Sequence, residues 1–79
     1  MDFFTAFTEL KNNKTICRNN FEYTIKFFPA IKEHVIFVKF IRNDNTVESF
    51  WSGLEDAIFT PLDIYADDWK VKDELQQDN

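Results

Sequence analysis

Hydrophobic positions in the first twelve residues recur at intervals of three and four. Four apolar side chains fall on one face of a helix at this spacing: Phe3, Ala6, Phe7 and Leu10. The pattern predicts an amphipathic helix over residues 2–12. Asp2 can accept hydrogen bonds from the first free N–H groups as the N-cap. Asn12 and Asn13 then end the helix, because asparagine tolerates the left-handed conformation that follows a helix C-terminus.

The pattern changes to a period of two after this helix. Residues 15–18 form a first short β-like run, and residues 22–28 alternate between apolar and polar side chains as a half-buried strand does. The apolar set is Tyr23, Ile25 and Phe27, and the polar set is Glu22, Thr24 and Lys26. Pro29 ends this strand, because proline cannot donate to a sheet ladder.

Residues 34–41 are apolar on both faces, which predicts the central strand of the sheet. Residues 43–45, Asn-Asp-Asn, have the composition of a turn. Residues 46–51 then return antiparallel, with Val47 and Trp51 on one face and Phe50 on the other. Residues 52–59 are predicted to connect this hairpin to the last part of the chain.

The chain ends with a second helix start and a short strand. Thr60 is a capping residue, Pro61 suits the first helical position, and Asp63 is an acid three residues after the cap. A short helix therefore precedes a final strand over residues 69–72. The predicted fold class is α+β: an N-terminal helix packed on a small antiparallel sheet of four to five strands, with a short helix before the last strand. Residues 1–73 form one domain and residues 74–79 a polar C-terminal tail.

Length and cysteine content limit what can stabilise this domain. A chain of 79 residues buries only about 60% of its unfolded surface. Cys17 is the single cysteine, so disulfides do not supplement the core, and a cytoplasmic location is expected without a signal peptide or an apolar run that spans a bilayer. We expect a homo-oligomer, a dimer or tetramer, to bury the remaining phenylalanine surface.

The net charge of −5 is unevenly distributed. Residues 1–42 carry seven basic and four acidic residues, a net charge of +3, and residues 43–79 carry two basic and ten acidic residues, a net charge of −8. An anionic ligand is therefore expected to bind the first half. The pI of about 4.6 argues against nonspecific binding to nucleic acid, which requires a clustered basic face.

The inventory of reactive residues argues against most enzymes. His34 is the only histidine and reads as a residue at a strand edge, and burial of Cys17 in a strand would raise its pKa. A single glycine, Gly53, excludes a glycine-rich phosphate loop. Asp63 and Asp67, or Asp67 with its neighbour Asp68, can face a divalent cation, but acids at a helix start are favoured by the helix dipole alone. The sequence predicts no catalytic group, metal or cofactor.

The aromatic residues divide into two groups. Five phenylalanines lie on faces that must form the core: Phe3, Phe7, Phe27, Phe37 and Phe40. Trp51, Phe21 and Trp69 lie instead at the ends of predicted elements beside polar residues. Such rings either complete the core, pack on a partner subunit or stack on a planar ligand. Arg18 with Phe21 forms a minimal pair for a phosphate and a base.

Both ends of the chain resemble one protein family. The opening motif is Phe3-x-x-Ala6-x-x-x-Leu10-Lys11 followed by Lys14-x-Ile16-x-Arg18-x-x-Phe21, and the closing motif is Asp63-Ile64-Tyr65-Ala66-Asp67-Asp68-Trp69-Lys70-Val71. These segments, roughly residues 3–21 and 60–71, are similar to the Thoeris anti-defence protein 2 family of small phage proteins. Asn13 stands where that family usually has glycine, and Phe21 where it usually has tryptophan.

The resemblance implies a sponge rather than an enzyme. Proteins of that family are homo-oligomers that capture a cyclic nucleotide-derived signal, typically a glycocyclic ADP-ribose made by the bacterial Thoeris immune system, without cutting it. In this chain Arg18 would pair with a phosphate and Phe21 or Trp69 would stack on adenine. Asp63 or Asp67 would accept hydrogen bonds from ribose hydroxyls. The location implied is the cytoplasm of an infected bacterial host.

Two other functions remain open at this stage. The acidic second half is also expected of a DNA mimic or another protein-binding inhibitor of a host defence enzyme, although its acids crowd around one motif instead of following a surface. A metal-dependent enzyme that cleaves a cyclic nucleotide would use the paired aspartates, and its activity would be lost with a chelator.

Overall fold

The N-terminal helix forms where the apolar spacing predicts it. The computed structural model describes residues 1–53 and 58–72, and its helix α1 spans Phe3–Lys11. The Asp2 carboxylate caps α1 by accepting the Thr5 N–H at 2.8 Å, and Asn13 takes the left-handed conformation with φ 69°. No helix within these described ranges is long and apolar enough to span a membrane.

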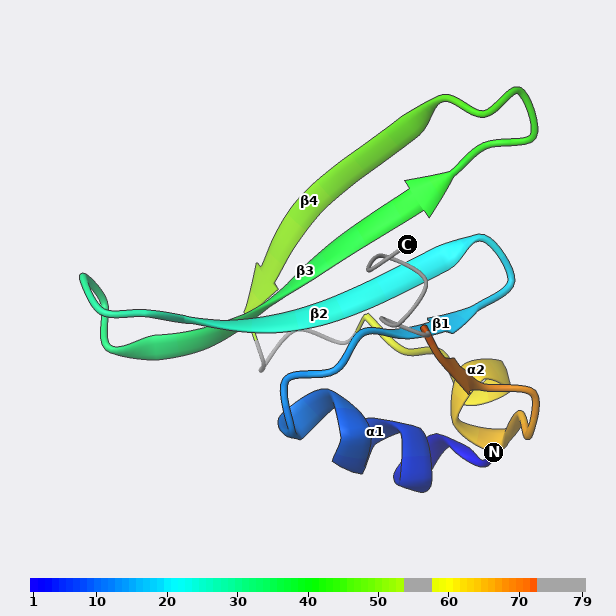
Figure 1. The fold of residues 1–79 in the computed structure, drawn as a ribbon, viewed down its shortest axis with the longest axis horizontal. Helices are drawn as coiled ribbons and strands as arrows, with labels where there is room; N and C mark the ends of the chain where they lie inside the picture. The colour runs from blue at the N-terminus through cyan, green and yellow to red at the C-terminus, as the bar shows by residue number, and fades with distance from the viewer. Residues whose placement is uncertain (54–57, 73–79) are drawn as a thin grey trace, which may run out of the picture.

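Five antiparallel strands form one sheet in the order β4-β3-β2-β1-β5 (Figure 1). Their bounds are Ile16–Arg18 (β1), Phe21–Phe28 (β2), Glu33–Ile41 (β3), Val47–Gly53 (β4) and Lys70–Val71 (β5). The predicted α+β arrangement is confirmed. The prediction that residues 34–41 form the central strand was wrong, because β1 and β5 add on the far side of β2 and make β2 the centre. β3 is still an interior strand, paired with β2 and β4.

A capping box begins the second helix, α2, which spans Pro61–Tyr65. The Asp63 N–H donates to the Thr60 hydroxyl at 3.3 Å, and the Thr60 N–H donates to the Asp63 carboxylate at 2.9 Å. The predicted helix start is therefore confirmed. Ser52 and Gly53 belong to β4 and not to a connection, which corrects one predicted boundary. The rest of that predicted connection, residues 54–57, and the predicted tail lie outside the described residues.

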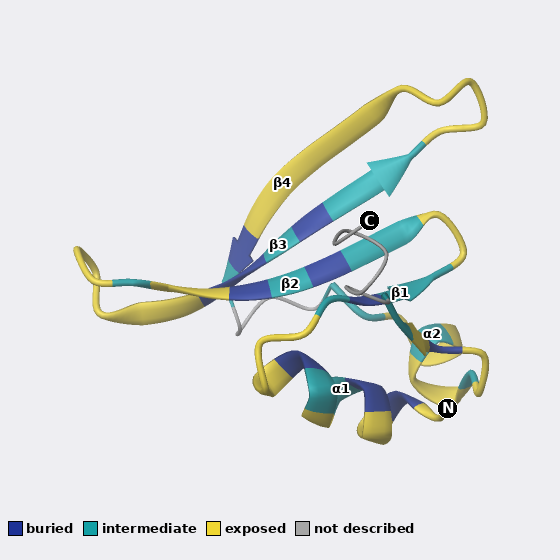
Figure 2. Ribbon diagram, viewed as in Figure 1, coloured by how far each residue is buried: buried dark blue, intermediate teal, exposed yellow. Residues whose placement is uncertain are grey.

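The core fills the space between α1 and one face of the sheet, which we call the inner face. Nine buried residues form it: Phe3, Ala6, Leu10, Ile16, Tyr23, Ile25, Ile36, Val38 and Trp69. Figure 2 shows this burial concentrated on the side of α1 that faces the sheet and along the middle of β2 and β3, whereas most of β4 is exposed. The opposite surface of the sheet, the outer face, does not contact α1.

Two of the five phenylalanines assigned to the core were assigned wrongly. Phe27 lies on the inner face but is 51% exposed, because α1 is too short to reach it. Nine helical residues extend over about 13 Å, whereas the eight residues of β2 extend over about 26 Å. Phe37 lies on the outer face, paired across the sheet with Trp51. Phe3 is buried, and Phe7 and Phe40 are partly buried.

Substitutions on the two faces of α1 test this core. Leu10→Ala is expected to lower the free energy of unfolding by about 2–5 kcal/mol, because it leaves a cavity under a fully buried side chain. Phe4→Ala on the same helix removes a side chain that is 69% exposed and is expected to cost about 0.5 kcal/mol or less. Urea denaturation followed by circular dichroism measures both, and equal losses would contradict the assigned face.

Candidate functional site

Arg18 lies in an ion cluster that joins β1 to the segment around α2. Its Nε donates to Asp68 Oδ1 at 2.7 Å and its Nη1 donates to Asp63 Oδ1 at 2.9 Å. The hydrogen bond from Arg18 lowers the pKa of the Asp68 carboxyl, and the same bond raises the pKa of the guanidinium. The cluster thus uses the charge of Arg18 within the chain, as a tie between segments 45 and 50 residues apart.

Asp63 connects this cluster to Trp69. Its backbone carbonyl accepts the indole N–H of Trp69 at 2.8 Å, while its carboxylate serves both the capping box and Arg18. The Trp69 side chain is 1% exposed and its ring centre lies 5.6 Å from that of Phe3 and 5.7 Å from that of Tyr23. Of the three alternatives for Trp69, namely the core, a partner subunit or a stacked ligand, the structure places it in the core.

Phe21 and Asp67 lie near this cluster without joining it. The Phe21 ring packs on the inner face against Phe40, with ring centres 4.7 Å apart, and stacks on Tyr23 at 6.1 Å. Burial raises the pKa of the Tyr23 hydroxyl to about 12. The Asp67 side chain is exposed, and its backbone carbonyl accepts a hydrogen bond from the amino group of Met1 at 3.2 Å. Phe21 therefore belongs to the packing of this end of the domain, and Asp67 contacts the N-terminus through its backbone carbonyl.

Trp51 lies apart from the other predicted site residues, on the outer face. Its ring centre is 4.4 Å from that of Phe37 and 4.9 Å from that of Phe28, and the residue remains 47% exposed. We call these three rings the outer aromatic cluster; Trp51 is its exposed member, and Phe28 and Phe37 are partly buried. A planar ligand can stack on such a surface.

A polar hollow, which we call the outer hollow, adjoins the outer aromatic cluster. It has a volume of about 260 Å³ and is lined by Thr15, Glu22, Thr24, Lys26, Phe37, Lys39 and Lys72. The pairing of β1 with β2 brings the hydroxyl of Thr15, which directly precedes β1, to 3.1 Å from that of Thr24 in β2. Phe37 belongs both to this hollow and to the outer aromatic cluster, so cationic and aromatic groups share one surface.

Lysines dominate the charge of this hollow. Three lysines face one carboxylate, that of Glu22, which accepts a hydrogen bond from Lys72 at 3.3 Å and lies 3.9 Å from the ammonium of Lys39. The hollow therefore keeps a net positive charge within a protein of net charge −5. Ammonium and hydroxyl donors in this arrangement suit a phosphate or another anion.

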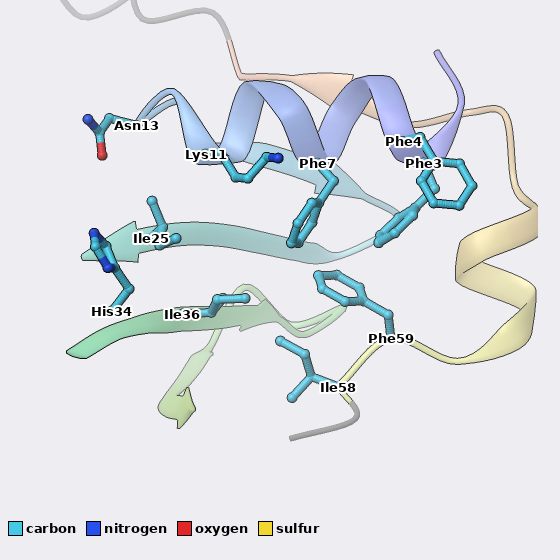
Figure 3. A pocket seen from close by; sticks show the side chains of 10 residues that line it. All are labelled: Phe3, Phe4, Phe7, Lys11, Asn13, Ile25, His34, Ile36, Ile58 and Phe59. Atoms are coloured by element: carbon cyan, nitrogen blue, oxygen red, sulfur yellow. The ribbon is translucent and has the colours of Figure 1, made fainter. Parts of the chain in front are cut away.

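A second and larger hollow, which we call the inner groove, lies on the inner face between α1, β2 and β3 (Figure 3). Its volume is about 630 Å³, and aromatic and aliphatic side chains form most of its wall, including Phe4, Phe7 and Phe59. Lys11, Asn13 and His34 supply its polar groups. Figure 3 shows Asn13 and His34 at one end and the phenylalanines toward the other. This groove suits an apolar ligand better than one carrying several phosphates.

Cys17 and the acidic residues do not form a reactive centre in the described part of the chain. Burial, assisted by the nearby charge of Glu22, raises the pKa of the Cys17 thiol, so the thiol stays protonated and weakly nucleophilic at neutral pH. Residues 1–53 and 58–72 contain no group of three or more histidine, cysteine, aspartate or glutamate side chains placed to hold a metal ion.

The lysines of the outer hollow were missed as site residues, although the sequence carried part of their signal. Lys26 belongs to the polar set that alternates along β2, and the positive charge of residues 1–42 indicated where an anion would bind. Lys72 arrives from the other end of the chain through the pairing of β5 with β1. That meeting depends on the strand order, which the periodicity does not contain.

Comparison with protein-family models, with curated proteins and with solved structures finds no match to this chain.

The ion cluster predicts how stability depends on pH. The pKa of Asp68 is lowered in the folded protein, so its stabilising contribution is present above the usual value of 3.8 and is lost as the pH falls through the lower folded value. Asp68→Asn is therefore expected to be less stable than the parent at pH 6, and the difference is expected to shrink as the pH falls below 3.8. Urea unfolding across this range measures the difference, with Asp67→Asn as the neighbouring control. A pH-independent difference would contradict the pairing with Arg18.

Proposed function

We propose that this protein is a non-enzymatic phage sponge that binds and sequesters a cyclic nucleotide immune signal of the glycocyclic ADP-ribose type. The observation that carries the ligand chemistry is the outer face of the sheet, where three lysines line a hollow that adjoins the outer aromatic cluster. An anionic nucleotide carries the complementary pair of groups, phosphates and a planar base. The phage host and the glycocyclic ADP-ribose type come from the resemblance of residues 3–21 and 60–71 to the Thoeris anti-defence protein 2 family.

The chemistry of the hollow divides the ligand into two parts. Lys26 and Lys39 bind the phosphates, since ammonium groups form charge-assisted hydrogen bonds with phosphate oxygens. The hydroxyls of Thr15 and Thr24, which also line the hollow, form hydrogen bonds with polar atoms of the ligand. The base stacks on the exposed ring of Trp51, an interaction worth about 1–3 kcal/mol per base.

Binding without catalysis agrees with the ion pairing of the carboxylate on this surface. A sponge needs affinity and no proton-transferring group, and the carboxylate in the hollow, Glu22, is already engaged by Lys72. Nanomolar affinity corresponds to about −12 kcal/mol, more than one shallow open surface usually supplies. We therefore include a homo-oligomer in the proposal, acting in the cytoplasm of an infected bacterial host.

The proposal changes the roles expected of the predicted site residues. Arg18 already donates to two carboxylates, so the phosphates are assigned to the lysines of the outer face. The stacking role that the resemblance implied for Phe21 or Trp69 is assigned to Trp51, for which stacking on a ligand was one of three expected alternatives. Asp63 and Trp69 fix the end of the domain that holds β5, and with it Lys72, against β1.

Ligand capture tests the function directly. The purified protein is mixed with glycocyclic ADP-ribose isomers and other cyclic nucleotides, free ligand is measured after filtration, and the protein is then heat-denatured. We expect depletion of one ligand class and its return in intact form on heating. Return in an altered form would show an enzyme, and no depletion of any nucleotide would favour an acidic inhibitor of a host protein.

Lysine substitutions test the location of the site. The double substitution Lys26→Ala with Lys39→Ala is expected to weaken binding of the captured nucleotide by at least about tenfold, because each lost charge-assisted hydrogen bond costs about 1.5–3 kcal/mol. Lys11→Ala removes a lysine from the inner groove and is expected to change the affinity by less than about twofold. Titration calorimetry measures both, and a larger effect of Lys11→Ala would move the site to the inner groove.

A further inference from the structure

We infer that two copies of this chain associate edge to edge through β4, antiparallel about a two-fold axis at Ser49. The two five-stranded sheets then form one continuous sheet. This inference deepens the proposed function, because it names the surface for the homo-oligomer included there, and the pairing itself does not require a nucleotide.

The backbone of β4 has hydrogen-bonding groups directed away from β3, toward an edge where no strand of residues 1–53 and 58–72 pairs. The Arg42 N–H donates to the Thr46 carbonyl at 2.8 Å, which marks these two residues as a hydrogen-bonded pair at the hairpin end. Such pairs alternate along an antiparallel ladder with pairs whose N–H and C=O groups point away from the neighbouring strand. Val47, Ser49 and Trp51 occupy the second kind of position, so their backbone groups point away from β3.

β4 has few of the features that usually protect an edge strand. Its seven residues include neither proline nor lysine. Its one charged residue, Glu48, is ion-paired with Arg42 of the same chain. The opposite edge, β5, has only two residues and begins with Lys70. A partner strand is therefore expected at β4.

The side chains of β4 are exposed on both faces of the sheet. Val47 and Trp51 lie on the outer face and Phe50 on the inner face, each about half exposed. Figure 1 shows β4 as the strand farthest from α1, and α1 therefore cannot cover Phe50. An isolated domain of this size gains stability from any further apolar burial, which favours an occupant at this edge.

The sequence of β4 fits a second copy of itself. With the axis at Ser49, Val47 of each copy lies opposite Trp51 of the other, and this apolar pair extends the outer aromatic cluster across the junction. Ser49, small and uncharged, lies opposite itself. Phe50 lies opposite Glu48, so no two like charges face one another. Each outward backbone group of Val47, Ser49 and Trp51 then has a partner.

The expected interface is small. One strand pair with its flanking side chains lies at the lower end of specific interfaces, below about 1,200 Å² in total. The dimer is therefore expected to be weak and to dissociate on dilution. Trp51 lies at the junction between the two copies and also beside the outer hollow. The outer hollows of the two copies therefore become neighbours in the dimer.

Sedimentation of the full chain with a backbone variant tests this edge. We expect the parent protein to change from monomer to dimer as its concentration rises from micromolar to millimolar. Ser49→Pro removes an N–H that points away from β3, so it spares the chain's own ladder and is expected to weaken dimerisation by at least tenfold. Ser49→Ala keeps that N–H and is expected to dimerise as the parent does. A monomer at all concentrations, or a folded Ser49→Pro variant that dimerises normally, would overturn the inference.

A cross-linking measurement tests the axis independently of stability. In a Cys17→Ser background, Ser49→Cys places two thiols opposite one another at about 5.5 Å between Cα atoms, a distance that a disulfide spans. Mild oxidation is expected to give a disulfide dimer much faster than for Lys11→Cys in the same background. Equal rates would overturn the axis at Ser49. Nucleotide capture by the Ser49→Pro variant is measured separately, so the ligand proposal and the dimer can fail independently.

Discussion

The burial of Trp69 is the interaction on which the rest of the structure depends. The indole ring lies between α1 and the inner face of the sheet, and its N–H is satisfied by the carbonyl of Asp63 at 2.8 Å. One side chain thereby joins the first helix, the second helix and the last strand. The aspartates near Trp69 stabilise the fold. Asp63 completes the capping box, and Asp63 and Asp68 accept hydrogen bonds from Arg18. Trp69, a tryptophan among aspartates in the sequence, thus completes a small core.

This one-sided core determines where a ligand can bind. Because α1 packs only on the inner face, the polar sets of β2 and β3 lie on a surface with Phe37 and Trp51. The anchoring of β5 beside β1 adds Lys72 to the lysines already there. Trp69 fixes the last strand beside β1 and so helps to determine the charge of the outer hollow, although Trp69 itself lies away from this hollow.

Local sequence signals predicted the elements, and they failed where spatial extent mattered. Periodicity and capping residues located α1, β2 and the start of α2, because these depend on neighbours within a few positions. Phe27 was misassigned because alternation defines the face of a strand and not the length of the helix that covers it. Phe37 was misassigned because a strand apolar on both faces does not reveal which face is packed. The partners of Arg18 lie 45 and 50 residues away, beyond any local pattern.

The central claim is that an anionic nucleotide binds the outer face, and amide NMR tests it most directly. Titration of the ¹⁵N-labelled protein with the glycocyclic ADP-ribose isomers reports each backbone amide separately. The account predicts shifts concentrated at Thr24, Lys26, Lys39 and Trp51, with little change along α1. Shifts concentrated at Phe7, Lys11 and Phe59 would place the ligand in the inner groove, and a spectrum unchanged by every isomer would contradict the account.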